Sequence, residues 1–273
     1  MRIMIHSNGP MVPSGYGKQC RLLVRELKKG GHDVAVSAFY GLSGSPIEWE
    51  GTTVFPAGML DFGKDVVLGH YLSWEADMLL CLFDFWKMAD SIDTLRQMRV
   101  AAIIPNDCYP LGRPDSHVLT QTGAHPMAMS RFGQQNLEAD GFGNTPYFPH
   151  AVDTHVFTPA EDRLAVRRDL GIPDDRFVIG ICAANMDAYR KGFAEQFQAV
   201  AKFRESHPET MLLVHSMPWS TRGLNLVQLA EDFGLTGHVV FADQYAQIAG
   251  AMTDEMMADW YNALDVLLEC SYA

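Results

Sequence analysis

The chain has 273 residues, and its 21 lysine and arginine residues against 33 aspartate and glutamate residues give a formal net charge of −12 with histidine neutral. The 48% hydrophobic content is that of a folded protein rather than a disordered one, and the acidic balance argues against nucleic acid as a partner. No apolar run reaches the roughly 18 residues that a membrane-spanning helix needs, so we expect no integral membrane segment.

Short apolar runs alternate with helical patterns through the first half of the chain. The runs that predict buried strands are Arg2–His6, Asp33–Phe39, Val66–Leu68, Met78–Phe83, Val100–Ile104, Met127–Met129 and the short Tyr147–Phe148. Helices are predicted after Gly17, with Cys20 and Val24 on the apolar face, and at Thr94–Met98 and Arg131–Ala139. Alternation of this kind is typical of a mostly parallel sheet.

A second alternating series follows an aperiodic break, Pro149–Pro159, that has proline at both ends. Its predicted strands are Phe177–Cys182, Met211–His215, Val239–Phe241 and Asp265–Cys270, and its predicted helices are Glu161–Leu170, Phe193–Arg204, Asn225–Phe233 and one capped by Thr253. The sequence therefore predicts an α/β protein with two Rossmann-like, doubly wound parallel-sheet domains, residues 1–157 and 158–273. No helix is predicted after the last strand, so we expect the second domain to be incomplete.

The first strand leads into a glycine-rich loop with Gly15 and Gly17, at a place where backbone N–H groups and a helix N-terminus can bind an anion. The loop is not a P-loop, because Gln19 stands where a serine or threonine should bind Mg²⁺. It is not a dinucleotide fingerprint either, because Cys20 replaces the third glycine. We assign Gly15 and Gly17 to phosphate binding, with a flexible turn as the alternative.

Arg190 and Lys191 stand at the start of a predicted helix in the second domain. Two adjacent cations there oppose the helix dipole, and a bound diphosphate would compensate for that cost. The alternative is ordinary solvated surface charge. Asn185, earlier in the same segment, and Tyr245 complete the predicted donor-binding set.

Three polar residues follow predicted strands of the first domain. Asn106 and Asp107 follow Val100–Ile104, where an acid can act as a base or orient a hydroxyl; the alternative is a helix cap. His70 ends the predicted strand Val66–Leu68, with a core ring as the alternative. The histidines show no HExxH or HxH spacing, so we expect no metal site.

Five segments together resemble one enzyme family, and they cover nearly the whole chain: Ser14–Gly17 with Gly31–Val34, Met127–Phe132, Pro149–Pro159, Gly180–Gly192 and Tyr261–Leu268. They resemble the GT-B glycosyltransferases of the retaining, family-four type, which use nucleotide sugars. The resemblance implies a hexosyltransferase-type enzyme that moves a sugar from a nucleoside-diphosphate sugar to an unknown acceptor hydroxyl with retention. It implies no metal and no cofactor, because the nucleotide sugar is a substrate.

The resemblance also implies roles for the candidate residues. Lys191 and Arg190 would take the charge that develops on the leaving diphosphate on the second domain. His70, Asn106 and Asp107 would lie on the acceptor side, with Asp107 as a further catalytic group. Asn106 stands where the family often has histidine, which departs from the pattern.

The family continues with a Glu-Gly-Phe-Gly motif where this sequence ends, so the resemblance implies a C-terminally truncated chain that is inactive alone. The alternatives are a non-catalytic nucleotide- or sugar-binding module of the same fold and a nicotinamide-dependent enzyme, which the incomplete glycine motif disfavours. The five cysteines are scattered and form no CxxC pair, which indicates reduced thiols and a cytoplasmic location. The sequence predicts no oligomeric state.

Overall fold

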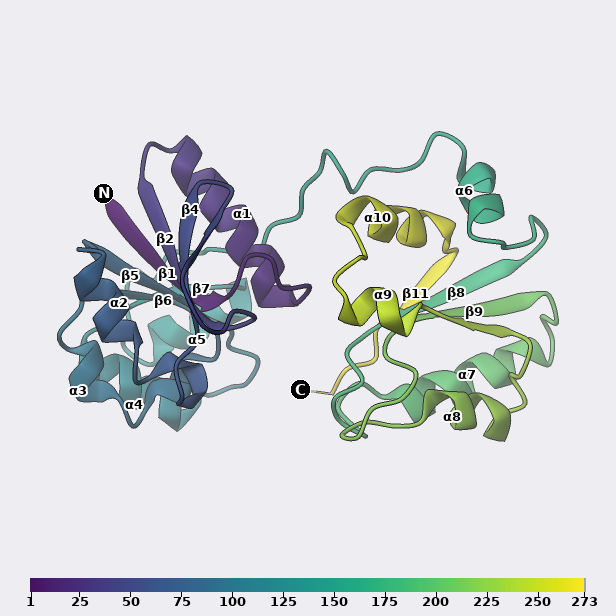
Figure 1. Ribbon diagram of the computed structural model, residues 1–273. Coiled ribbons are helices and arrows are strands. Elements are labelled where there is room, and N and C mark those ends of the chain that lie inside the picture. The colour runs from purple at the N-terminus through teal and green to yellow at the C-terminus, as the bar shows by residue number, and fades with distance from the viewer. Residues whose placement is uncertain (273) are drawn as a thin grey trace. The chain divides into compact units, whose positions relative to one another are not determined.

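The computed structural model describes residues 1–272, without the side chain of Ile248, and forms two compact units, Met1–Val152 and Asp153–Ala273. The sequence placed the division at residue 157. Each unit has its own parallel sheet with helices on both faces (Figure 1), as predicted for two Rossmann-like domains. No helix within residues 1–272 is long and apolar enough to cross a membrane.

Unit 1 is built on a seven-stranded sheet in the order β3-β4-β2-β1-β5-β6-β7. Every neighbouring pair is parallel except β3 and β4. The strands are β1 (Arg2–Asn8), β2 (Asp33–Tyr40), β3 (Ile47–Trp49), β4 (Thr52–Phe55), β5 (Met78–Leu82), β6 (Val100–Ile104) and β7 (His125–Ala128). Tyr147 adds a single parallel bridge to Ala128 of β7.

Helices cover both faces of this sheet (Figure 1). The long helix α1 (Gly15–Lys29) buries Cys20 and Val24 on one face, as its apolar periodicity predicted. The other core contains side chains of α2 (Val67–Ser73), α3 (Ile92–Leu95), α4 (Arg113–Thr122), α5 (Arg131–Ala139) and the 3-10 turn Phe85–Met88; a second 3-10 turn is Asp61–Gly63.

One predicted strand of unit 1 is wrong. Val66–Leu68 is not a strand; the chain enters helix α2 there, with Val67 and Tyr71 buried one turn apart. Strands β3 and β4 and helix α4 were not predicted from the sequence. A short apolar run has no period of its own, so strand and helix were indistinguishable at Val66–Leu68.

Unit 2 has a four-stranded, all-parallel sheet in the order β10-β9-β8-β11. Its strands are β8 (Phe177–Cys182), β9 (Thr210–His215), β10 (Val239–Phe241) and β11 (Val266–Leu268). Helices α7 (Phe193–Arg204) and α8 (Leu226–Asp232) pack on one face, and α6 (Arg163–Asp169) and α10 (Asp254–Ala263) pack on the other (Figure 1). Helix α9 (Gln244–Ile248) follows β10.

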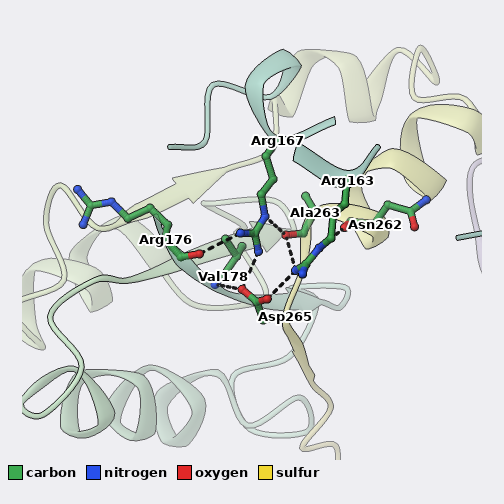
Figure 2. Close-up of polar contacts among 7 residues, drawn as sticks. All are labelled: Arg163, Arg167, Arg176, Val178, Asn262, Ala263 and Asp265. Carbon is green, nitrogen blue, oxygen red and sulfur yellow. Dashed lines mark hydrogen bonds and ion pairs between the residues drawn. The ribbon is translucent and has the colours of Figure 1, made fainter. Parts of the chain in front are cut away.

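An ion-pair network around Asp265 holds the edge strand β11 in place (Figure 2). The Asp265 carboxylate accepts hydrogen bonds from Arg167 at 2.6 Å, from Arg163 at 2.7 Å and from the backbone N–H of Val178 at 2.7 Å. These bonds lower the pKa of the carboxyl group despite its partial burial. Helix α6, the end of α10 and strand β8 are thereby joined at one carboxylate.

Arg167 is the most buried cation of this network, with its side chain only 5% exposed. Its guanidinium also donates to the carbonyl oxygens of Ala263 and Arg176, so it has partners at the end of α10, just before β8 and just before β11 (Figure 2). A buried charge that loses one partner is destabilising, because the desolvation cost of the other remains.

We therefore predict that Arg167→Ala lowers the free energy of unfolding by about 3 kcal/mol, at the low end for a broken buried pair because Asp265 keeps Arg163. Arg168→Ala is the matched control, since the neighbouring Arg168 is 55% exposed and makes only surface ion pairs. Urea unfolding followed by circular dichroism measures both. Equal losses for the two variants would contradict a structural role of the network.

Candidate functional site

The residues assigned to the donor side of unit 2 all follow the carboxyl ends of its strands. Asn185, Arg190 and Lys191 lie between β8 and α7, and Tyr245 lies in α9 after β10. Because all four strands of this sheet are parallel, these segments lie along one edge. That edge is where ligands bind in open α/β sheets.

Lys191 stands directly before the N-terminus of α7, and residues that follow β11 hold its side chain. Its Nζ donates to Ser271 Oγ at 3.0 Å and lies 3.8 Å from the Glu269 carboxylate. Gly192 adopts φ +56°, and a Cβ there would lie 2.6 Å from the carbonyl oxygen of Cys270. Helix α7 has no side-chain cap, so its first-turn N–H groups supply anion donors beside the ammonium group.

Arg190 is fixed by its backbone while its side chain is exposed. Its N–H donates to Asp187 Oδ1 at 2.7 Å, and its carbonyl oxygen accepts from the N–H of Tyr272 at 2.8 Å. The hydrogen bonds from the backbone of Arg190 and Tyr189 hold the pKa of Asp187 below its ordinary value. The turn before α7 is therefore an ordered part of the edge, from which the guanidinium extends.

Asn185 is buried, with 1% of its surface exposed, and it braces a neighbouring loop. Its amide donates to the carbonyl oxygens of Met217 and Leu224 at 3.0 and 2.7 Å, and its Oδ1 accepts from the N–H of Leu224 at 2.9 Å. Its amide thus serves the loop after β9. Tyr245 has the opposite environment, since its side chain is 79% exposed.

In unit 1, Tyr16 and Asp84 meet beside β1, where the strand order of the sheet reverses. Strand β1 lies between β2 and β5, so the loops after β1 and β5 flank the switch point that binds ligands in this class of fold. The Tyr16 hydroxyl donates to Asp84 Oδ1 at 3.4 Å. Burial, together with the charge of Asp84, raises the pKa of Tyr16. Neither residue was predicted as a site residue, although Asp84 directly follows the predicted strand Met78–Phe83.

The two candidate glycines beside this point differ in their surroundings. A Cβ on Gly17 would lie 2.3 Å from the carbonyl oxygen of Val12, so this position requires glycine for packing. Ser14 Oγ caps the helix by accepting the N–H of Gly17 at 3.1 Å. A Cβ on Gly15 would meet open space, so its backbone is open to a ligand.

Asp107 belongs to a group of three carboxylates with Asp84 and Asp115. Burial, with the charges of Asp84 and Asp107, raises the pKa of Asp115 to about 6. Asn106 supports this group from the side: its Oδ1 accepts from Asn136 at 2.6 Å and its amide donates to the carbonyl oxygen of Cys108. Asn106 thus fixes the turn that presents the exposed Asp107.

His70 lies in α2 rather than at a strand end, and its imidazole contacts Ser37 of β2. Its Nδ1 is 3.0 Å from Ser37 Oγ, which is also 3.1 Å from Nδ1 of the fully buried His6. Burial lowers the pKa of His6 to about 4 and lowers the pKa of His70 as well. Within residues 1–272, no three His, Cys, Asp or Glu side chains are grouped to hold a metal ion.

The buried His6 predicts a pH-dependent stability. The folded state holds His6 neutral down to about pH 4, while an unfolded histidine protonates near pH 6.5. The unfolded state thus binds more protons between these values, and stability falls as the pH falls through that window, by about 3 kcal/mol from this residue. Urea unfolding at several pH values should show that His6→Gln reduces this loss.

The exposed His117 provides the control, since His117→Gln leaves the buried ring in place. A His6→Gln variant whose stability falls with pH as steeply as that of the wild-type protein would contradict the neutral, buried assignment.

Similar proteins are found by structure and not by sequence: no protein-family model and no curated protein matches the chain. A sucrose-phosphate synthase from Thermosynechococcus elongatus matches with a TM-score of 0.75 at 16% identity, over 99% of this chain and 75% of that one. Anabaena Alr3699/HepE in complex with UDP-glucose gives a TM-score of 0.68 at 15% identity, over 99% and 74%. WaaG, a glycosyltransferase involved in lipopolysaccharide biosynthesis, gives 0.64 at 14%, over 100% and 75%.

Structural likeness at such low sequence identity shows the fold alone. The two parallel-sheet units and the match over nearly the whole chain agree with the resemblance found in the sequence. The protein therefore has the GT-B fold of these glycosyltransferases.

Proposed function

We propose that this protein transfers a sugar, of the hexosyl type, from a nucleoside-diphosphate sugar to an acceptor hydroxyl with retention. Unit 2 binds the donor and unit 1 binds the acceptor. The observation that carries the proposal is Lys191, held beside the uncapped N-terminus of α7 at the carboxyl edge of a parallel sheet. A structure of the same fold, Anabaena HepE, contains UDP-glucose, which supports a nucleotide sugar as the donor class.

The proposed chemistry rests on charge that appears when the sugar leaves its diphosphate. The ammonium of Lys191, the guanidinium of Arg190 and the first N–H groups of α7 would face that charge and stabilise the transition state. Glu269 and Ser271 hold the ammonium group. A diphosphate would replace a surface ion pair with charge-assisted hydrogen bonds. We propose that these cations take the place of a metal ion.

The acceptor side would use the polar groups at the switch point of unit 1. Asp107 is exposed. Because carboxylates accept hydrogen bonds from hydroxyl groups, Asp107 would orient the attacking oxygen. The pKa of Asp115, about 6, lets this carboxyl exchange a proton near neutral pH. We also infer a cytoplasmic location, because five scattered cysteines without a disulfide among residues 1–272 suit a reducing compartment.

We predict that Lys191→Ala in the full-length polypeptide lowers turnover by about 10²–10³-fold, because it removes a preorganised group that stabilises the leaving diphosphate. Lys191→Arg should restore only part of the turnover, since a planar guanidinium cannot replace a compact ammonium group in a confined site. Release of UDP from UDP-glucose in the presence of a panel of free sugars measures the reaction.

Lys202→Ala is the matched control, because Lys202 lies at the other end of the same helix and is exposed. A turnover of Lys191→Ala close to that of Lys202→Ala would contradict the role of Lys191 in stabilising the leaving diphosphate. Binding of UDP-glucose without turnover by the unaltered protein would favour the alternative, a non-catalytic binding module of the same fold.

A further inference from the structure

Four side chains of unit 1 lie in one row across the sheet. Register pairs Phe55 of β4 with Ser37 of β2, Ser37 with His6 of β1, and His6 with Cys81 of β5. Above this row, the ring of His70 stacks on Phe55 with 4.8 Å between centroids and places Nδ1 3.0 Å from Ser37 Oγ. Three polar groups, two imidazoles and a hydroxyl, therefore form one continuous chain.

The partners at the buried end fix the direction of the hydrogen bonds. Both nitrogens of His6 lie near a carbonyl oxygen, Nε2 at 2.9 Å from Phe62 and Nδ1 at 3.0 Å from Ser37, and a carbonyl oxygen can only accept. The two nitrogens differ because Nδ1 also lies 3.1 Å from the Ser37 hydroxyl, which can donate. With the proton on Nε2, that nitrogen donates to Phe62 and Nδ1 accepts from the Ser37 hydroxyl, so both nitrogens have a partner. With the proton on Nδ1, Nε2 would face only an acceptor.

The donor and acceptor roles at the His70 end of this hydrogen-bonded row follow from those at His6. Because the Ser37 hydroxyl donates to His6, its oxygen is left to accept from His70 Nδ1. The proton of the neutral His70 ring is thus on Nδ1. Its Nε2 is left with a lone pair, and no hydrogen-bond partner for this atom occurs among residues 1–272.

Backbone strain shows that the buried end is firmly held. Phe62 has φ +58°, a left-handed conformation that costs a non-glycine residue of order 1–3 kcal/mol. Its carbonyl oxygen accepts the hydrogen bond from His6 Nε2, and its ring packs against Phe39 and Phe83, which also pack against His6. A fixed carbonyl oxygen anchors the tautomer of His6 and, through Ser37, that of His70.

We propose that His6 and Ser37 are positioning residues that hold His70 in its Nδ1–H tautomer, so that Nε2 accepts a hydrogen bond from the hydroxyl group of the acceptor sugar. The assignment of an acceptor rests on the proposed function; the tautomer does not. Besides the neutral His6, the titratable group that acts on His70 is Asp65, in the turn before α2, whose carboxylate accepts hydrogen bonds from the backbone N–H groups of Met59 and Leu60.

The tautomer is tested directly by nitrogen-15 NMR of the histidine rings at neutral pH. We expect a protonated Nδ1 and an unprotonated Nε2 for His70 in the wild-type protein, and loss of this preference in Ser37→Ala. Ser73→Ala is the matched control: Ser73 lies on the same helix and its hydroxyl bonds only the backbone carbonyl of His70. A wild-type His70 protonated at Nε2, or a Ser37→Ala spectrum identical to that of Ser73→Ala, would overturn the proposal.

Kinetics test whether the tautomer of His70 serves acceptor binding. The acceptor in these measurements is the free sugar that the wild-type protein glycosylates fastest. Ser37→Ala should raise the KM for this acceptor by roughly 2- to 10-fold, the effect of one hydrogen bond, without a matching rise in the KM for UDP-glucose. Equal rises for both substrates would overturn the acceptor role. A wild-type protein that glycosylates no sugar refutes the proposed function instead, while the NMR result still decides the tautomer.

Discussion

The carboxylate of Asp265 is the contact on which the arrangement of unit 2 depends. This carboxylate joins Arg163 and Arg167 of α6 to the N–H of Val178 at the start of β8. The backbone N–H of Asp265 donates in turn to the carbonyl oxygen of Val178. Strand β11 begins at the next residue and pairs with β8 alone. The segment after β11 then contacts Lys191 and packs against Gly192. An ion pair at one end of an edge strand thereby determines what surrounds the candidate phosphate site at the other end.

The sequence predicted the elements of unit 2 well because its buried strands and amphipathic helices have different periods. Strand β8 and helix α7 have the predicted bounds, and Thr253 caps α10 as expected. The contacts of Lys191 could not be predicted, because Ser271 is 80 residues away in the sequence and reaches it only through the pairing of β11 with β8. Asn185 shows the same limit: its place in the segment before Arg190 predicted donor binding, and the backbone groups that its amide contacts belong to a loop that only folding brings near it.

Chemistry in unit 1 depends on register in the same way. His6 and Ser37 looked like ordinary strand residues, and His70 was placed on a strand that does not exist. The parallel pairing of β1 with β2 puts His6 beside Ser37, and the short helix α2 then brings His70 onto the hydroxyl. A polar chain of this kind is stable only when every donor faces an acceptor, since an unmatched buried group costs about 1–3 kcal/mol. Phe62, whose backbone is in the left-handed conformation and whose carbonyl oxygen is the last acceptor, is therefore part of the same hydrogen-bonded row.

The two candidate sites also differ in charge, and that difference indicates which ligand each can hold. At the carboxyl edge of unit 2, Lys191 and Arg190 adjoin an uncapped helix N-terminus, a combination that attracts a diphosphate. At the switch point of unit 1, burial, with the charges of Asp84 and Asp107, raises the pKa of Asp115 to about 6, and burial with the charge of Asp84 raises that of Tyr16. Carboxylates at this place favour neutral groups that donate hydrogen bonds, as sugar hydroxyls do. The division of labour proposed for the two units thus follows from electrostatics within each unit, with the anionic donor on unit 2 and the hydroxyl acceptor on unit 1.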